Sequence, residues 1–120
     1  MSEDVLWPRA SQWLASGQIS SNLDLAVLGV PAHLTSISST GAHTTPAAVR
    51  SALQRYSTWS TTHAVDVGQL KIADFGDVED PDSPEGEVRT QALVKSAIES
   101  AQLTLVLGGD NSVTFAAMTG

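Results

Sequence analysis

The stretch LTLVLGGDNSVT, residues 103–114, joins a short apolar run to two glycines and a group of polar side chains. The run at 103–107 is typical of a strand, and the residues from Val113 onward are apolar and helix-like. In open parallel sheets, ligands bind at the carboxyl ends of the strands, where such a turn would lie. The stretch therefore predicts a strand, a turn suited to a functional site, and a helix.

The sequence upstream alternates strand-like and helix-like segments. Apolar runs at 25–30 and 70–75 predict two further strands, and the first of them suits a strand that is buried on both faces. Helices are predicted at 8–16, at 45–57 and from Ser83-Pro84 onward. This alternation is typical of an α/β fold with a parallel sheet covered by helices.

The strand at 103–107 is very apolar, and in a complete sheet its free edge would normally meet another strand. We therefore expect residues 1–120 to form a single partial α/β domain. It would contain only the N-terminal strands of a three-layer α/β/α parallel sheet.

The composition of the chain excludes several classes of function. The chain has 120 residues, a net charge of −7 and only six lysines and arginines. It therefore lacks the basic surface through which proteins bind nucleic acids and anionic membranes. It has no cysteine, which excludes disulfides and thiolate metal sites. No window reaches the roughly 18 apolar residues of a membrane span, and the acidic N-terminus does not fit a secretory signal. We expect a globular cytoplasmic protein.

The turn after the third predicted strand is the best place for chemistry. Gly108 and Gly109 let the backbone turn sharply and approach a ligand closely. Asp110, Asn111 and Ser112 then present oxygen atoms at the start of a helix. The same pattern fits a plain glycine turn in which Asp110 or Ser112 caps the helix, and the local pattern alone favours that simpler interpretation.

Three motifs, in order along the chain, resemble segments of one enzyme family. LGGDNSVT at 107–114 resembles the ureohydrolase segment LGGDHS[IV]T, whose histidine binds one of two manganese ions. DFGD at 74–77 resembles the family's D-x-G-D. The family pattern G-[IV]-P…G-A…G-P-x-x-[IV]-R fits without insertion at Gly29-Val30-Pro31, Gly41-Ala42, Pro46 and Val49-Arg50. The chain thus resembles the N-terminal portion of a ureohydrolase, the family of arginase, agmatinase and formimidoylglutamase.

Within that family, VPAH at 30–33 and RYSTW at 55–59 resemble bacterial formimidoylglutamase-like members. The resemblance implies an arginase-like fold, a cytoplasmic homo-oligomer, a small amidine substrate and a role in histidine degradation. The complete protein would use Mn²⁺ and convert N-formimidoyl-L-glutamate and water to L-glutamate and formamide. Two alternatives stay open. One is a non-catalytic α/β module that binds a partner or assembles through its sheet edge, and the other is a degenerate ureohydrolase that has lost metal binding.

Asn111 occupies the position of the family's metal-binding histidine. An amide oxygen is a weaker donor than an imidazole, although Mn²⁺ accepts oxygen ligands. The family's other ligands come from an Asp-Ala-His-x-Asp segment and a later Asp-x-Asp, and neither occurs within residues 1–120. The resemblance therefore implies no catalytic residue in this chain and at most a metal-side role for Asn111. It implies structural roles beside the site for Gly108, Gly109, Asp110 and Ser112. We expect the chain alone to bind no Mn²⁺ and to be inactive.

His33 and His43 lie in the loop that borders the active site in this family, so the resemblance implies substrate contacts for both. Their spacing does not match that of paired metal ligands, and exposed loop histidines are the simpler interpretation. The acidic segment at 77–87 contains prolines and lacks the spacing of a calcium-binding loop. It predicts a solvated surface loop.

Overall fold

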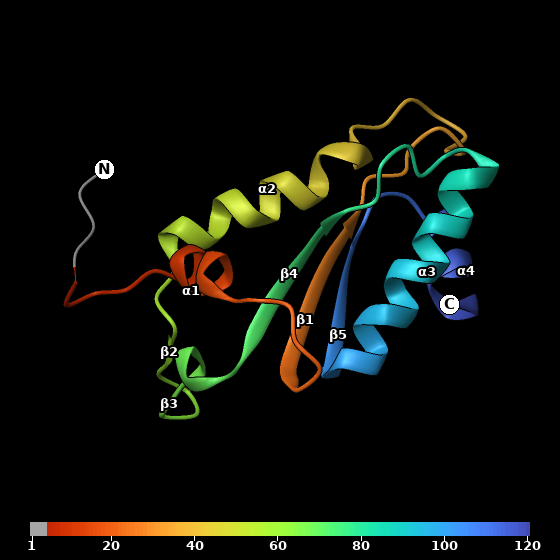
Figure 1. The fold of residues 1–120 in the computed structure, drawn as a ribbon. Coiled ribbons are helices and arrows are strands. Elements are labelled where there is room, and N and C mark those ends of the chain that lie inside the picture. Colours follow the sequence, from red (N-terminus) through yellow and green to blue (C-terminus); the bar gives the residue numbers. More distant parts are fainter. Residues whose placement is uncertain (1–4) are drawn as a thin grey trace.

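The computed structural model describes residues 5–120, which contain a central sheet of three parallel strands in the order β4-β1-β5 (Figure 1). The strands are β1 (Leu23–Val30), β4 (Ile72–Asp77) and β5 (Ala101–Gly108). The crossovers contain α2 (Thr45–Ala52) between β1 and β4, and α3 (Pro84–Ser100) between β4 and β5. The predicted α/β fold with a parallel sheet is therefore confirmed, and its strands lie where the three apolar runs place them.

β1 is the centre of the sheet because it has a neighbouring strand along each edge and helices over each face. Its Leu25 pairs with Ile72 of β4 and with Leu103 of β5. Ala26 and Leu28 are completely buried. The uninterrupted apolar run is typical of a strand that is buried on both faces, because neither face contacts water and neither needs polar side chains.

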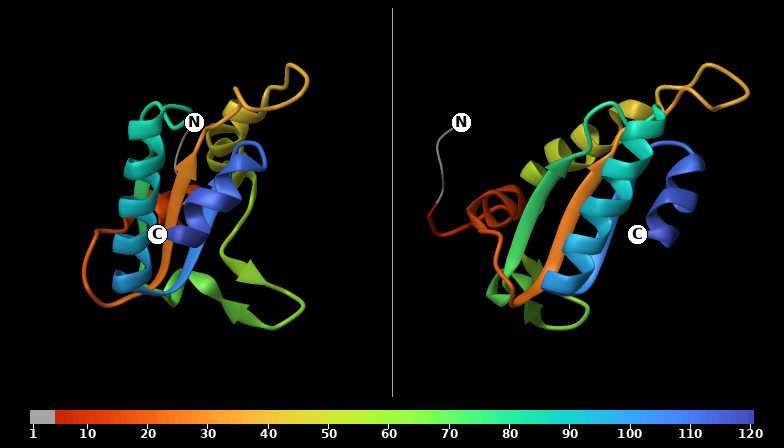
Figure 2. Two further views of the ribbon diagram at one scale, coloured as in Figure 1. Left: turned by 90° about the vertical axis from the view of Figure 1, so that its right-hand side faces the viewer. Right: turned by 45° about the vertical axis from the view of Figure 1, so that its right-hand side comes forward.

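Helices cover both faces of the sheet, and Figure 2 shows α2 and α3 on opposite sides of it. On the α3 face, α4 (Ser112–Thr119) completes a core around Leu28, Val94 and Val113. On the other face, Leu14 of α1 (Ala10–Ser16) packs with side chains of β1 and β4. The predicted three layers are present. None of the helices in residues 5–120 is long and apolar enough to cross a membrane.

The structure shortens one predicted helix and adds a hairpin. The helix expected at 45–57 ends at Ala52, and a 3₁₀ turn at Leu53–Arg55 follows it. The chain then forms a two-stranded antiparallel hairpin from β2 (Trp59–Ser60) and β3 (Val65–Asp66). Each of these strands has only two residues, so no alternating apolar pattern marks them in the sequence.

Within the described residues, β5 pairs with β1 alone and forms an edge of the sheet. Leu107 packs against the core on the α1 face, but Leu103 and Leu105 lie outside that cluster and are 65% and 47% exposed. The most apolar stretch of the sequence is therefore only partly buried in these residues. The last residues of this stretch lead directly into the turn at 109–111.

Candidate functional site

Three loops meet at the carboxyl ends of the central strands (Figure 1). They cover residues 31–44 after β1, 78–83 after β4 and 109–111 after β5. The first loop is hydrogen-bonded to each of the others. The His33 backbone N–H donates to the Asp82 carboxylate, and the Asp110 backbone N–H donates to the Ala32 carbonyl at 2.9 Å. The turn singled out in the sequence thus lies at the sheet edge where open α/β folds bind ligands.

Gly109 allows the turn after β5 to lie directly against the loop after β1. Its N–H donates to the Val30 carbonyl at 3.2 Å. A Cβ atom at Gly109 would lie 2.3 Å from the Ala32 oxygen, closer than real Cβ contacts, whereas one at Gly108 would meet Val113 at an ordinary 3.7 Å. The close approach that Gly109 allows is to this chain's own backbone, and an approach to a ligand stays a prediction. Gly108 is not required for the contact with the backbone.

Asp110 accepts hydrogen bonds from both of these segments. Its Oδ2 accepts from the hydroxyls of Thr35 and Ser36, each at 3.0 Å. Its Oδ1 accepts from the Ser112 backbone N–H at 3.0 Å and from the Ser112 hydroxyl. The Ser112 hydroxyl is the largest of the effects that hold the pKa of Asp110 below its usual range, because hydrogen bonds to a carboxylate favour its charged form. Asp110 therefore caps the first turn of α4, as the local pattern indicates, and also binds the loop after β1.

Asn111 lies at the N-cap position of α4, where its side chain makes no capping hydrogen bond. The residue is exposed and lines a surface hollow of about 340 Å³ together with Gly109, Thr114 and Met118. Asp110 performs the capping in its place. The Asn111 amide is consequently available to a ligand in this hollow, but it offers a single neutral oxygen.

The residues present do not by themselves fit a metal site. Manganese prefers several oxygen or nitrogen ligands. In the part of the chain that the structure describes, no group of three or more histidine, cysteine, aspartate or glutamate side chains is placed to hold a metal ion. The carboxylate nearest to Asn111 in sequence, that of Asp110, already accepts hydrogen bonds at both oxygens.

The structure brings His33 and His43 together in the loop after β1. Their ring centroids are 4.1 Å apart, with an angle of 39° between the planes. His33 Nδ1 is buried and lies 3.5 Å from Asp82 Oδ2, without the geometry of a hydrogen bond. The substrate contacts that the resemblance implies for the two histidines stay a prediction.

Residues 84–87 begin α3, and most acidic residues at 77–87 are exposed as predicted, but Asp82 is an exception. Its side chain is only 8% exposed, and its Oδ1 accepts from the backbone N–H groups of His33 and Leu34, each at 3.1 Å. Buried carboxylates persist where such donors replace water. Its partners are almost fifty residues away in the chain, and its place directly before the helix-capping Ser83 gives no local sign of them.

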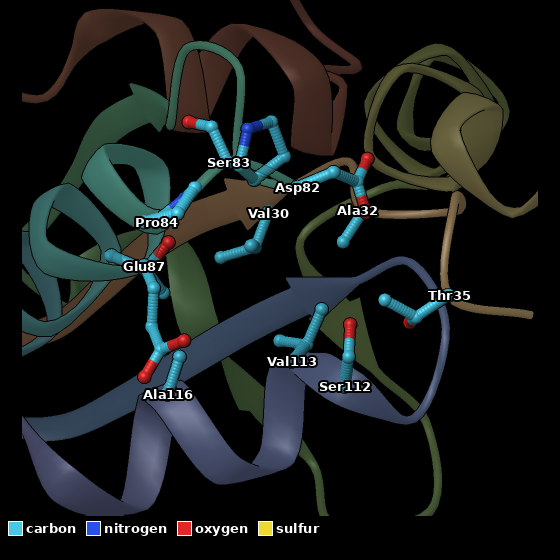
Figure 3. A pocket seen from close by; sticks show the side chains of 12 residues that line it. Val30, Ala32, Thr35, Asp82, Ser83, Pro84, Glu87, Ser112, Val113 and Ala116 are labelled. Atoms are coloured by element: carbon cyan, nitrogen blue, oxygen red, sulfur yellow. The ribbon is translucent and has the colours of Figure 1, made fainter.

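A cavity of about 230 Å³ lies between α3, α4 and the loop after β1 (Figure 3). Val30 and Val113 form part of its apolar wall, and Figure 3 shows Glu87 and Ser112 beside it. Thr35 and Ser112, which donate to Asp110, also line this cavity. The turn after β5 is thus flanked by two hollows, one that contains Asn111 and one that does not.

Residues of two of the sequence motifs contact one another at the end of β4. Arg50 Nε and Nη2 donate to the two oxygens of Asp74, each at 2.8 Å, and Nη1 donates to Asp77 at 2.5 Å. The hydrogen bonds to Asp74 are the main cause of a raised pKa for Arg50. Burial is the largest effect on the pKa of Asp74 and raises it, but the hydrogen bonds from Arg50 and from the Gly76 N–H, together with the charge of Arg50, outweigh it and leave that pKa lowered. These ion pairs fasten α2 to β4 beside the site.

Comparison with known proteins agrees with this arrangement. The model of the arginase family matches residues 23–120. The chain is 33% identical over 93 residues to a formimidoylglutamase from Halalkalibacterium halodurans, covering 74% of this chain and 29% of that protein. It is 30% identical over 95 residues to an agmatinase from Pyrococcus horikoshii, covering 77% of this chain and 34% of that one. The chain therefore spans about a third of the length of these relatives.

Solved structures share the fold. The formimidoylglutamase of Bacillus subtilis superposes with a TM-score of 0.82 at 23% identity, over 98% of this chain and 38% of that one. A Trypanosoma cruzi formiminoglutamase determined with Mn²⁺ has a TM-score of 0.77 at 25% identity, over 92% of this chain and 38% of that one. The match of the family model to most of the sequence, together with this shared architecture, shows that the chain belongs to the arginase family.

Proposed function

We propose that this chain is the N-terminal portion, in one partial domain, of a metal-dependent amidine hydrolase, and that the complete protein hydrolyses N-formimidoyl-L-glutamate. The observation that carries the proposal is the match of the arginase family model over residues 23–120. Formimidoylglutamases from Halalkalibacterium halodurans and Halobacterium salinarum, 33% and 34% identical to this chain, favour this substrate within the family.

The reaction is a hydrolysis without a redox step. The oxygen of water adds to the formimidoyl carbon, and the bond from that carbon to the glutamate nitrogen breaks. One proton of the water goes to the imine nitrogen and the other to the glutamate nitrogen, so that formamide and L-glutamate leave. Because residues 1–120 carry no assigned acid, base or nucleophile, the chain alone is inactive in this proposal.

Mn²⁺ is proposed for the complete protein by analogy with the T. cruzi formiminoglutamase that was determined with this ion. Since the described residues do not fit a metal site alone, no step is assigned here to a metal held by this chain. Asn111 would lie on the metal side of the site, and His33 and His43 would contact the substrate. The complete protein is further proposed to be a cytoplasmic homo-oligomer of histidine degradation.

The test compares the 120-residue chain with the complete gene product that contains it, each supplied with Mn²⁺ and N-formimidoyl-L-glutamate. We expect the complete product to release equal amounts of formamide and glutamate, and the chain alone to release neither. Agmatine serves as the control substrate, because an agmatinase is also among the relatives. Preferential hydrolysis of agmatine would refute the substrate assignment. A complete product inactive on every amidine would favour the non-catalytic module or the degenerate ureohydrolase.

A further inference from the structure

Residues 33–36, termed the bridge segment, are held on one side by a buried carboxylate. Asp82 Oδ1 accepts from the His33 and Leu34 backbone N–H groups, each at 3.1 Å. Its Oδ2 also accepts from the His33 backbone N–H, at 3.2 Å. Loop N–H groups that leave water need such an acceptor, since an unpaired buried donor destabilises the fold. The first half of the bridge segment is therefore fixed to the loop after β4.

The second half of the bridge segment is held by another carboxylate on the opposite side. Thr35 and Ser36 donate their hydroxyls to Asp110 Oδ2, each at 3.0 Å. The capping of α4 needs only the other oxygen, Oδ1, which accepts from Ser112. The contacts of Oδ2 are therefore additional to the helix cap. A carboxylate can serve all these donors at once because it only accepts hydrogen bonds.

The other two loops bind the loop after β1 at Ala32, through the Asp110 backbone N–H, and at the bridge segment. Directly after the bridge segment, Ile37 is fully exposed. Between them, the two carboxylates join the ends of all three central strands at the bridge segment.

We propose that Asp82 and Asp110 are positioning residues, which hold the bridge segment at a fixed place beside the turn that carries Asn111. The inference rests on the function proposed above, in which His33 contacts the substrate and Asn111 lies on the metal side. Through Asp110, the placement of His33 and that of Asn111 depend on each other. Neither carboxylate touches the reacting atoms in this scheme.

The first test measures amide hydrogen exchange in the full 120-residue chain. The double variant Thr35→Val, Ser36→Ala removes the two hydroxyl donors and leaves the cap between Asp110 and Ser112 intact. We expect exchange to rise roughly five- to tenfold both in the bridge segment and at the start of α4, as the loss of one or two hydrogen bonds implies. The urea midpoint should change little. Ser38→Ala, in the same loop, is the matched control and should leave both regions unchanged.

Unchanged exchange at the start of α4 would overturn the proposal, and so would faster exchange throughout the chain. The conservative variant Asp110→Asn should retain most of the protection, because its amide oxygen can accept from Ser112 and its nitrogen can donate to the two hydroxyls. Asp110→Ala should lose it. If the double variant fails to fold, Ser36→Ala alone provides the same comparison.

A second readout uses the complete gene product with N-formimidoyl-L-glutamate. We expect the Thr35→Val, Ser36→Ala variant to raise KM by roughly five- to tenfold with a smaller change in kcat, since the bridge segment carries the proposed substrate contact. Ser38→Ala should leave both constants unchanged. An unaltered KM would refute the substrate-positioning role. If the unsubstituted product shows no amidine hydrolysis, the proposed function fails, whereas the exchange experiment still decides whether the two segments are coupled.

Discussion

Gly29 and Arg50 belong to one sequence motif and Asp77 to another. The three nevertheless lie together at the carboxyl ends of β1 and β4. A Cβ atom on Gly29 would come within 1.9 Å of Asp77 Oδ1, the oxygen that accepts from Arg50. The glycine is therefore required by the ion pair of its neighbour and not by a turn of its own. Such atomic contacts explain why these residue types stand at these positions.

The Arg50 ion pair predicts a pH dependence of stability. The pKa of Asp74 is lower in the folded chain than in the unfolded one. Its contribution to the free energy of unfolding is thus complete above the unfolded pKa of about 3.9 and is lost as the pH falls through the folded pKa. In Arg50→Met, burial raises the pKa of Asp74 instead. We expect this variant to be destabilised most near neutral pH, and the difference to shrink below about pH 4.

Urea unfolding of the native chain and of Arg50→Met across that pH range measures this difference. Arg55→Met, in the exposed 3₁₀ turn after α2, is the control and should differ from the native chain by a nearly constant amount. A destabilisation of Arg50→Met that does not depend on pH would contradict a role for the charge on Asp74.

Gly108, the last residue of β5, and Gly109, directly after it, predict different outcomes for the same substitution. Gly109→Ala places a methyl group against the Ala32 backbone, which cannot move as a flexible side chain does. We expect the free energy of unfolding to fall by about 1–3 kcal/mol. Gly108→Ala, whose new methyl group meets Val113 at 3.7 Å, should change it by less than about 1 kcal/mol. Urea denaturation of both variants is the measurement, and equal effects would refute the steric argument.

At the level of elements, the central strands and main helices follow from local sequence. The run at 25–30 lies within β1, and Ser83 caps α3 by accepting from the Gly86 N–H at 2.9 Å. The site needs more than local sequence. Asp110 contacts Thr35 across 75 residues, and no periodicity or turn signal encodes so distant a partner. The turn could thus be located from the sequence, whereas its coupling to the bridge segment could not.

Helix α3 gives a test of the layer arrangement. Val94 is 2% exposed and packs into the core beside Leu28, whereas Val88 on the same helix is 64% exposed. We expect Val94→Ala to lower the free energy of unfolding by about 2 kcal/mol, from lost burial and the cavity left behind. Val88→Ala should have an effect within about 0.5 kcal/mol. Thermal or urea unfolding compares them, and a larger cost at Val88 would contradict the orientation of α3.

At the scale of the whole molecule, metal binding is the property that separates this chain from its proposed complete form. We expect isothermal titration of Mn²⁺ into the 120-residue chain to show no saturable binding, because one amide oxygen is too weak a site. The same titration into the complete gene product should saturate. Tight stoichiometric binding by the chain alone would mean that His33, His43 or the acidic segment forms a site that the geometry does not indicate.

The position of β1 in the middle of the sheet has a consequence for how the chain folds as the ribosome makes it. β1 emerges before either of its partners, since Leu25 pairs with Ile72 and with Leu103. Both pairings close long loops, which slows folding and leaves apolar segments open to wrong contacts. The nascent segment at 23–30 therefore keeps its apolar side chains open to wrong contacts until residues 101–108 have left the exit tunnel.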